Sequence, residues 1–325
     1  MDLPAKGPFN RLRFRQLEMV CVIAELGSLR SASERMHQCA PALSKGLREV
    51  ERIVGDPLFD RSPQGLLPTK AGTNFIREAR KVLNQLARLH ETFGKDAERR
   101  PAELTIGSAA SLAWCVLPRA LRAFSEGAGR PRIRLAEGRI VPLAEQLRMG
   151  DLDAIVMLAT PEVIEVLDDP TLVVDQIHRE QNVVVAARSF PGLRRTVKWK
   201  SLREVPWILP PPSFLQRRIV QQAFLAAGEL PPEPFVELIN MPAALRFAEA
   251  GLGVTAVPRY AAQREIAEGR LRVVKPQAEL AGVPIGFAYR RSATNRDLLL
   301  RLRDAVRECM RVPAPAASGK APPNS

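Results

Sequence analysis

The chain has 325 residues, a formal net charge of +13 and a sequence pI near 10.3. Hydrophobic residues make up 46% and charged residues 26%, which excludes a wholly disordered or fibrous protein. This length suffices for two or three domains with cores of their own. The net positive charge favours a polyanionic partner, which could be nucleic acid or an anionic membrane surface. The basic surplus is denser in the first 100 residues, so a nucleic-acid site is sought there.

The spacing of the reactive residues disfavours several kinds of site. The cysteines form no C-x-x-C pair and the histidines fall in different segments, so we expect no disulfide framework, metal or cofactor. Neither a G-x-S-x-G elbow nor a P-loop is present, and we expect no enzyme activity. The N-terminus lacks the apolar core of a signal peptide, and no uncharged stretch reaches the about 18 residues that span a bilayer. A cytoplasmic protein without a membrane partner is expected.

Two consecutive helices are predicted near the N-terminus. The first has one apolar stripe at i, i+3, i+4 and i+7, made by Leu17, Val20, Cys21 and Ala24. Gly27 suits the left-handed residue that ends a helix, and Ser28 suits the N-cap of the next. That second helix is expected to bury three apolar side chains: Leu29, Ala32 and Met36.

A third helix is predicted from about Pro41, which fits a first turn because it lacks an N–H. One face is apolar and consists of Leu43, Leu47, Val50 and Val54. Another face is small, polar and basic and consists of Pro41, Ser44, Lys45 and Arg48. Such a helix can be anchored on one side and enter a major groove with the other. A three-helix bundle with a solvated face is the alternative at this point.

A short hairpin is predicted after the third helix. Residues 57–61 and 65–69 fit a strand, a turn and a return strand. This hairpin would form a wing that places Arg61 beside the DNA backbone. The wing strengthens the DNA-binding interpretation.

Residues 17–72 resemble the N-terminal domain of LysR-type transcriptional regulators. The matching pieces are Gly27-Ser28, Ala32, Pro41-Ala42-Leu43-Ser44, Glu51, Gly55, Leu58-Phe59-Asp60-Arg61 and Thr69-Lys70-Ala71-Gly72. Cys39 departs from the usual capping Ser, and Ala40 from a polar residue that commonly reads a base. The resemblance implies a winged helix-turn-helix over residues 11–70. It also implies DNA contacts by Arg30, Pro41, Ser44, Lys45, Arg48 and Arg61.

A linker helix is predicted over residues 71–95. Its apolar seam has spacings of 4, 3, 4, 3 and 4 and consists of Phe75, Ala79, Val82, Leu86, Leu89 and Phe93. The seam requires a partner, either the same helix of a second subunit or the chain's own C-terminal domain. In the resembling family it is the dimer helix, which implies a homodimer or homotetramer and a near-palindromic operator.

From Glu103 onward, short apolar runs alternate with helical stretches, which predicts an α/β fold with a largely parallel sheet. The looser resemblance here, including Leu117-Pro118 and Gly150-Asp151-Leu152-Asp153, implies a two-lobed effector-binding domain like a periplasmic solute-binding protein. We expect this domain over 102–312, with lobe one at 102–175 and 280–312 and lobe two at 176–279. A disordered tail is expected over 313–325. Overall the fold class is α+β.

Candidate effector contacts follow the predicted strands. A strand at 104–106 and a helix at 111–124 would place the loop at 107–111 at a helix N-terminus, a natural anion site. Ser111 matches a family position that contacts effectors, and N-capping is its other possible role. The full candidate set is Ser108, Ser111, Arg139, Ile140, Ser213 and Asn240. Helix N-termini and arginine favour an anionic effector, and a sugar-like one is also considered. Gly251 is expected to end a helix.

The sequence thus predicts a ligand-responsive transcriptional regulator. Its partners would be double-stranded DNA, a small-molecule effector, a second copy of the chain and RNA polymerase. The competing hypothesis is a cytoplasmic solute-binding protein or enzyme with an incidental helical N-terminus. Salt-sensitive duplex binding would separate the two.

Overall fold

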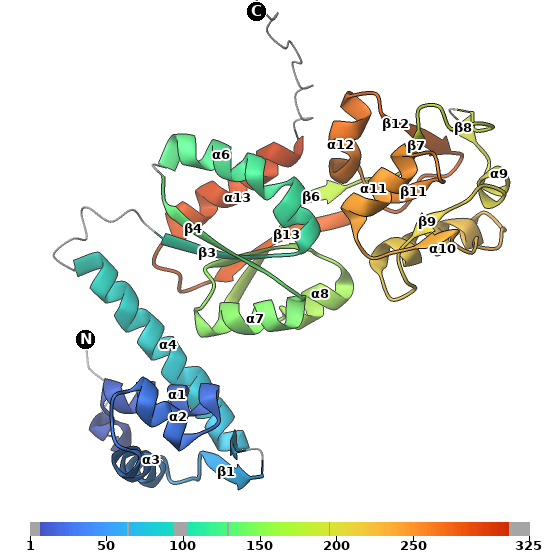
Figure 1. The fold of residues 1–325 in the computed structure, drawn as a ribbon. Coiled ribbons are helices and arrows are strands. Elements are labelled where there is room, and N and C mark those ends of the chain that lie inside the picture. Colours follow the sequence, from blue (N-terminus) through green and yellow to red (C-terminus); the bar gives the residue numbers. More distant parts are fainter. Residues whose placement is uncertain (1–6, 64, 94–102, 129, 195, 312–325) are drawn as a thin grey trace, which may run out of the picture. The chain divides into compact units, whose positions relative to one another are not determined.

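A computed structural model describes residues 7–63, 65–93, 103–128, 130–194 and 196–311, and the chain forms two compact units (Figure 1). The N-terminal unit, blue in Figure 1, is mostly helical. Its elements are η1 (Pro8–Arg11), α1 (Phe14–Leu26), α2 (Leu29–Arg35), α3 (Ala40–Val54), β1 (Phe59–Ser62), β2 (Gly65–Pro68) and α4 (Lys70–Phe93). The last two residues of the predicted linker helix, 94–95, and the predicted tail at 313–325 lie outside the described residues.

The predicted junction between α1 and α2 is confirmed. Gly27 ends α1 with a φ of 61°, and the Ser28 hydroxyl accepts a bond of 3.4 Å from the Ser31 amide. Ala32 is fully buried, whereas Leu29 and Met36, which were also expected inside, are half-buried. α2 has only seven residues, so its ends lie at the edge of the core.

α3 packs its apolar face inward as predicted, with one correction in its last turn. Leu43, Leu47 and Val50 are buried. Ile53 is buried and Val54 is half-buried, because both flank the stripe where the helix ends at Gly55. The helix therefore has one side fixed to its own domain.

The predicted wing is also present and is tied to both neighbouring helices. β1 and β2 pair antiparallel from Phe59 opposite Pro68. The Leu58 amide donates to Glu51 Oε1 at 2.9 Å. Thr69 Oγ1 donates to the Pro57 carbonyl at 2.7 Å and accepts from the Gly72 amide at 2.9 Å, which caps the start of α4.

The apolar seam of α4 is buried in the N-terminal unit over its first part and exposed further along the helix. Phe75 and Ala79 pack in the core of the N-terminal unit, and Ala79 is only 3% exposed. Ala79 is therefore buried in the N-terminal unit, which is neither of the two partners expected for the seam. Val82 and Leu86 are exposed. The Leu89 and Phe93 side chains lie outside the described residues.

The described residues of the C-terminal unit form a five-stranded sheet, a four-stranded sheet and a two-stranded sheet. The five-stranded sheet and its helices are here called lobe one, and the other two sheets and their helices are called lobe two. Lobe one consists of β3 (Glu103–Ser108), α5 (Ala110–Cys115), α6 (Leu117–Ala128), β4 (Arg132–Glu137), α7 (Ile140–Met149), β5 (Ala154–Leu158), α8 (Pro161–Val166), β6 (Leu172–Glu180), β13 (Val283–Arg290) and α13 (Arg296–Arg311). Lobe two consists of β7 (Asn182–Ala187), β8 (Thr196–Val197), α9 (Trp199–Arg203), β9 (Ile208–Leu209), α10 (Leu215–Ala226), β10 (Val236–Glu237), α11 (Met241–Glu249), β11 (Thr255–Pro258), α12 (Arg259–Ala267) and β12 (Leu271–Pro276).

The sheets are mixed, which corrects the expectation of largely parallel pairing. In lobe one the strand order is β4-β3-β5-β13-β6, where β3 is parallel to β4 and β5 but β13 is antiparallel to both of its neighbours. In lobe two β7 pairs antiparallel with β11 and β12. The reason is that the chain crosses between lobes and re-enters lobe one by a strand running the opposite way.

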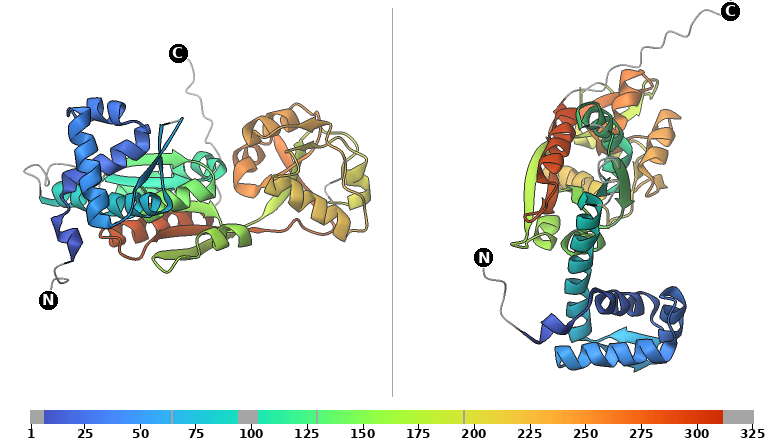
Figure 2. Two further views of the ribbon diagram at one scale, coloured as in Figure 1. Left: turned by 90° about the horizontal axis from the view of Figure 1, so that it is seen from below. Right: turned by 90° about the vertical axis from the view of Figure 1, so that its left-hand side faces the viewer.

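The chain passes between the lobes twice. β6 leads through Gln181 into β7, and β12 leads through residues 277–282 into β13 (Figure 2, left). β6 stays paired with β13 as far as Glu180 opposite Val283. The two passages form the hinge of the C-terminal unit.

The helix predicted over 111–124 is in fact two helices. α5 ends at Cys115 with Val116 as its C-cap, and α6 begins at Leu117. Pro118 explains the break, because it has no N–H to donate to the preceding turn and fits only at a helix start.

Candidate DNA-binding surface and effector site

The outward face of α3 is polar and basic. Pro41, Lys45 and Arg48 are exposed, and Ser44 is half-buried. The Arg48 Nε donates to the Ser44 carbonyl at 3.3 Å, which lays the guanidinium along the helix. Because the opposite face of α3 is packed in the core, this face is held outward and rigid.

The remaining predicted DNA contacts come from α2 and the wing. Arg30 is on α2, with a side chain that is 89% exposed and 3.7 Å from Glu34. Arg61 is exposed on β1. Cys39 is the N-cap of α3 and makes no capping bond with its side chain, in line with its departure from the usual Ser.

The two serines predicted to bind an effector are both engaged within the protein. Ser108 is fully buried, and its hydroxyl donates to the Ala109 carbonyl at 3.1 Å. Ala109, not Ser111, is the N-cap of α5, which corrects the capping role considered for Ser111. The Ser111 hydroxyl instead accepts a bond of 3.1 Å from the Tyr260 hydroxyl of lobe two. α5 has six residues, too few for the extended helix on which the predicted anion site depended.

The other predicted effector residues follow strand ends. Arg139 and Ile140 come after β4, next to β3, and the two strands are parallel. Ser213 and Asn240 come after the parallel strands β9 and β10 of lobe two. Carboxyl ends of parallel strands share one edge, which is where ligands bind in open α/β sheets. Asn240 also caps α11, since its Oδ1 accepts from the Ala243 amide at 2.9 Å. Gly251 ends this segment with a φ of 79°, as predicted.

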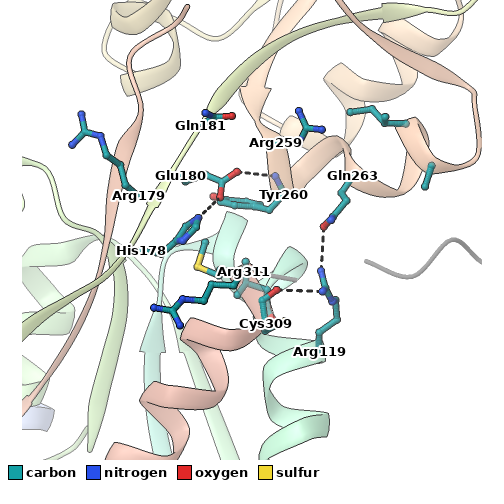
Figure 3. Close-up of a pocket in the computed structure, with 14 residues that line it drawn as sticks. Arg119, His178, Arg179, Glu180, Gln181, Arg259, Tyr260, Gln263, Cys309 and Arg311 are labelled. Atoms are coloured by element: carbon teal, nitrogen blue, oxygen red, sulfur yellow. Dashed lines mark hydrogen bonds and ion pairs between the residues drawn. The ribbon is translucent and has the colours of Figure 1, made fainter. Parts of the chain in front are cut away.

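A cavity of about 490 Å³ lies at the hinge, between both lobes (Figure 3). The six predicted effector residues, all within the described ranges, are not part of its lining. Its lining residues are Val116, Arg119, His178, Arg179, Glu180, Gln181, Arg259, Tyr260, Gln263, Ile266, Ala267, Cys309, Met310 and Arg311.

A buried carboxylate organises this cavity. Glu180 Oε1 accepts from the Tyr260 amide at 3.0 Å, and Oε2 lies 3.2 Å from His178 Nε2. Burial raises the pKa of the Glu180 carboxyl, and burial likewise raises the pKa of the Tyr260 phenol. None of these residues was among the site residues predicted from the sequence. The available signal was the i, i+2 spacing of His178 and Glu180, which places both on one face of a strand.

No cluster of three metal-ligating side chains occurs among the described residues. None of their helices combines the length and apolar character required to cross a membrane.

A winged helix-turn-helix joined to a two-lobed ligand-binding domain defines a DNA-binding, ligand-responsive regulator. Residues 14–73 match the family described as "Bacterial regulatory helix-turn-helix protein, lysR family", and residues 97–311 match the "LysR substrate binding domain". The chain belongs to the LysR family of transcriptional regulators. The family consists of regulators, so the competing hypothesis of an enzyme with an incidental helical N-terminus is rejected.

Individual proteins agree with this assignment. The HTH-type transcriptional regulator PcaQ of Agrobacterium fabrum is 26% identical over 303 residues, covering 92% of this chain and 95% of PcaQ. A full-length OxyR variant from Pseudomonas aeruginosa is 22% identical with a TM-score of 0.68, covering 96% of this chain and 99% of that structure. Full-length CbnR in complex with its target DNA is 23% identical with a TM-score of 0.62, covering 92% of this chain and 100% of the CbnR chain.

Proposed function

We propose that α3 enters the major groove of operator DNA through Pro41, Ser44, Lys45 and Arg48. The outward, basic face of α3 is the observation that carries this proposal, because it is fixed in place by the buried face behind it. Short side chains at the helix start allow close approach, and the two cations can reach phosphates or guanine edges. Arg61 of the wing and Arg30 of α2 are proposed to contact the backbone.

The effector is proposed to be a small anion bound where the two lobes face each other. The strand ends that carry Ser111, Arg139, Ser213 and Asn240 support this location, and the arginine supports a carboxylate. Ser108 and Ile140 complete the proposed set. The boundaries of the lobes and domains belong to the same proposal. Lobe one spans 102–175 and 280–312, and lobe two spans 176–279. The DNA-binding domain spans 11–70, and the linker helix spans 71–95.

The bond from Tyr260 to Ser111 gives this effector a way to act. An effector that takes the Ser111 hydroxyl must displace Tyr260, which changes the contact between lobes. The new lobe arrangement would change the spacing of DNA-binding heads in an oligomer, and so the bend imposed on the operator.

A homodimer or homotetramer is proposed, with α4 as the pairing helix. Val82 and Leu86 are 44% and 37% exposed at i, i+4, beyond the part of α4 that its own domain covers. RNA polymerase is the protein partner that such a regulator would act through, and the cytoplasm is where it would meet the chromosome.

The test of the DNA surface uses a duplex selected from a random library by the full-length protein. Ser44→Asp places a carboxylate against phosphates and should weaken binding by about tenfold or more. Ser201→Asp, exposed on α9, adds the same charge to a helix of lobe two and should leave affinity unchanged. Equal affinity and equal salt dependence for Ser44→Asp and the wild type would reject the proposed surface.

The oligomer test is sedimentation of Leu86→Lys beside Gln85→Lys. Both positions are exposed on α4, but only Leu86 is on the seam. Leu86→Lys should lower the mass of the particle and Gln85→Lys should not. Identical masses would reject α4 as the pairing helix.

A further inference from the structure

We infer that the hinge cavity is a second ligand site, distinct from the proposed effector site, that binds a small organic anion. This goes beyond the proposed function, because it uses other residues and a different ligand contact. Its volume of about 490 Å³ is within the range of small-molecule sites.

The charge of the lining selects an anion. Four arginines and one carboxylate are among the lining residues, and the arginines are Arg119, Arg179, Arg259 and Arg311. Arg311 is already paired with Glu308 at 3.0 Å, so an anion is expected at the other three. The one carboxylate, Glu180, is buried, accepts from the Tyr260 amide at 3.0 Å and lies 3.2 Å from His178 Nε2, so both of its oxygens are engaged within the protein. In the part of the chain that the structure describes, no carboxylate lies within ion-pair distance of Arg179 or Arg259, and Figure 3 shows both at the cavity.

The apolar part of the lining selects an organic molecule over a bare ion. Val116, Ile266 and Met310 contribute hydrocarbon surface beside the polar groups. A carboxylate or phosphate group on a small carbon body would place its charge against the arginines and its body against these side chains.

The cavity joins the lobes, which gives such a ligand a regulatory role. Arg119 of α6 in lobe one donates from Nη1 to Gln263 Oε1 of α12 in lobe two at 3.1 Å, and from Nη2 to the Cys309 carbonyl at 3.2 Å (Figure 3). Arg259 begins α12 in lobe two. An anion held by both lobes stabilises the lobe arrangement that contains the cavity, and is thereby coupled to the state of the hinge.

The experiment is isothermal titration of the full-length protein at constant ionic strength with succinate, 3-phosphoglycerate and inorganic phosphate in separate arms. At least one of the two organic probes should bind saturably to the wild type. The double variant Arg179→Gln, Arg259→Gln should weaken that binding by about tenfold or more, since charged hydrogen bonds are lost. Both side chains are exposed, and the melting temperature of the variant should match that of the wild type.

Two controls distinguish this site from other cationic surfaces and from the proposed effector site. Arg203→Gln removes an exposed arginine on α9 and should change nothing, and Ser213→Ala, at an exposed residue of the proposed effector set outside this cavity, should also leave this binding intact. The inference is overturned if neither organic probe binds, if inorganic phosphate alone binds, or if Ser213→Ala abolishes binding while the double arginine variant keeps it.

Discussion

Replacing Gly72 with alanine sets two effects of opposite sign against each other. Alanine is favoured over glycine in a helix by about 1 kcal/mol. However, a Cβ at Gly72 would overlap the Leu58 carbonyl oxygen and lie 2.8 Å from the carbonyl carbon. Leu58 cannot retreat, because its amide is bonded to Glu51 and its carbonyl accepts from the Thr69 amide at 3.0 Å. The overlap should cost about 3 kcal/mol or more, so the net effect is a loss of about 2 kcal/mol.

Gly46→Ala is the matched control within the same domain. Its Cβ would meet Met19 Sδ at 3.0 Å and Cε at 3.3 Å, the flexible end of a side chain that can move aside. The helix preference of alanine then prevails, and the variant should be unchanged or up to about 1 kcal/mol more stable.

Urea unfolding followed by two probes isolates the N-terminal unit. All three tryptophans are in the C-terminal unit, namely Trp114, Trp199 and Trp207. Tryptophan fluorescence therefore follows that unit, whereas far-UV circular dichroism also follows the helical N-terminal unit. Gly72→Ala should move only the dichroism transition to lower urea. A Gly72→Ala protein as stable as the wild type by dichroism would refute the steric argument.

Three other predictions follow from exposure and charge. In an anisotropy titration, the logarithm of the DNA affinity falls as the logarithm of the salt concentration rises. Lys45→Gln should make this slope less steep by about 0.9, and an unchanged slope would mean that Lys45 contacts no phosphate. Ellman's reagent at pH 8 should modify the exposed Cys39 quickly and Cys115 slowly, because burial raises the pKa of Cys115 to about 12. A fast phase of modification that persists in the Cys39→Ser variant would contradict this prediction. Burial raises the pKa of Glu180 above its ordinary 4.5, so the folded state holds this proton more tightly than the unfolded state and loses stability as the pH rises above 4.5. The free energy of unfolding of Glu180→Gln should therefore increase relative to that of the wild type as the pH rises above 4.5, and parallel curves would exclude this role.

Local signals in the sequence determined the N-terminal unit. Gly27, Ser28 and the apolar stripe of α3 predicted helix ends and faces that the structure confirms, and the wing followed from its own turn residues. These features depend on neighbours within one or two helical turns, so periodicity and capping chemistry suffice to predict them.

Tertiary structure alone decided the hinge and the use of the linker seam. Tyr260 reaches Ser111 across 149 positions and Glu180 across 80, so no periodic pattern could have paired them. Ala79 continues the seam in sequence but is buried in its own domain, because α4 packs there before it becomes exposed at Val82. Local patterns fix which face of an element is apolar, but the partner of that face is chosen by packing between segments distant in the chain.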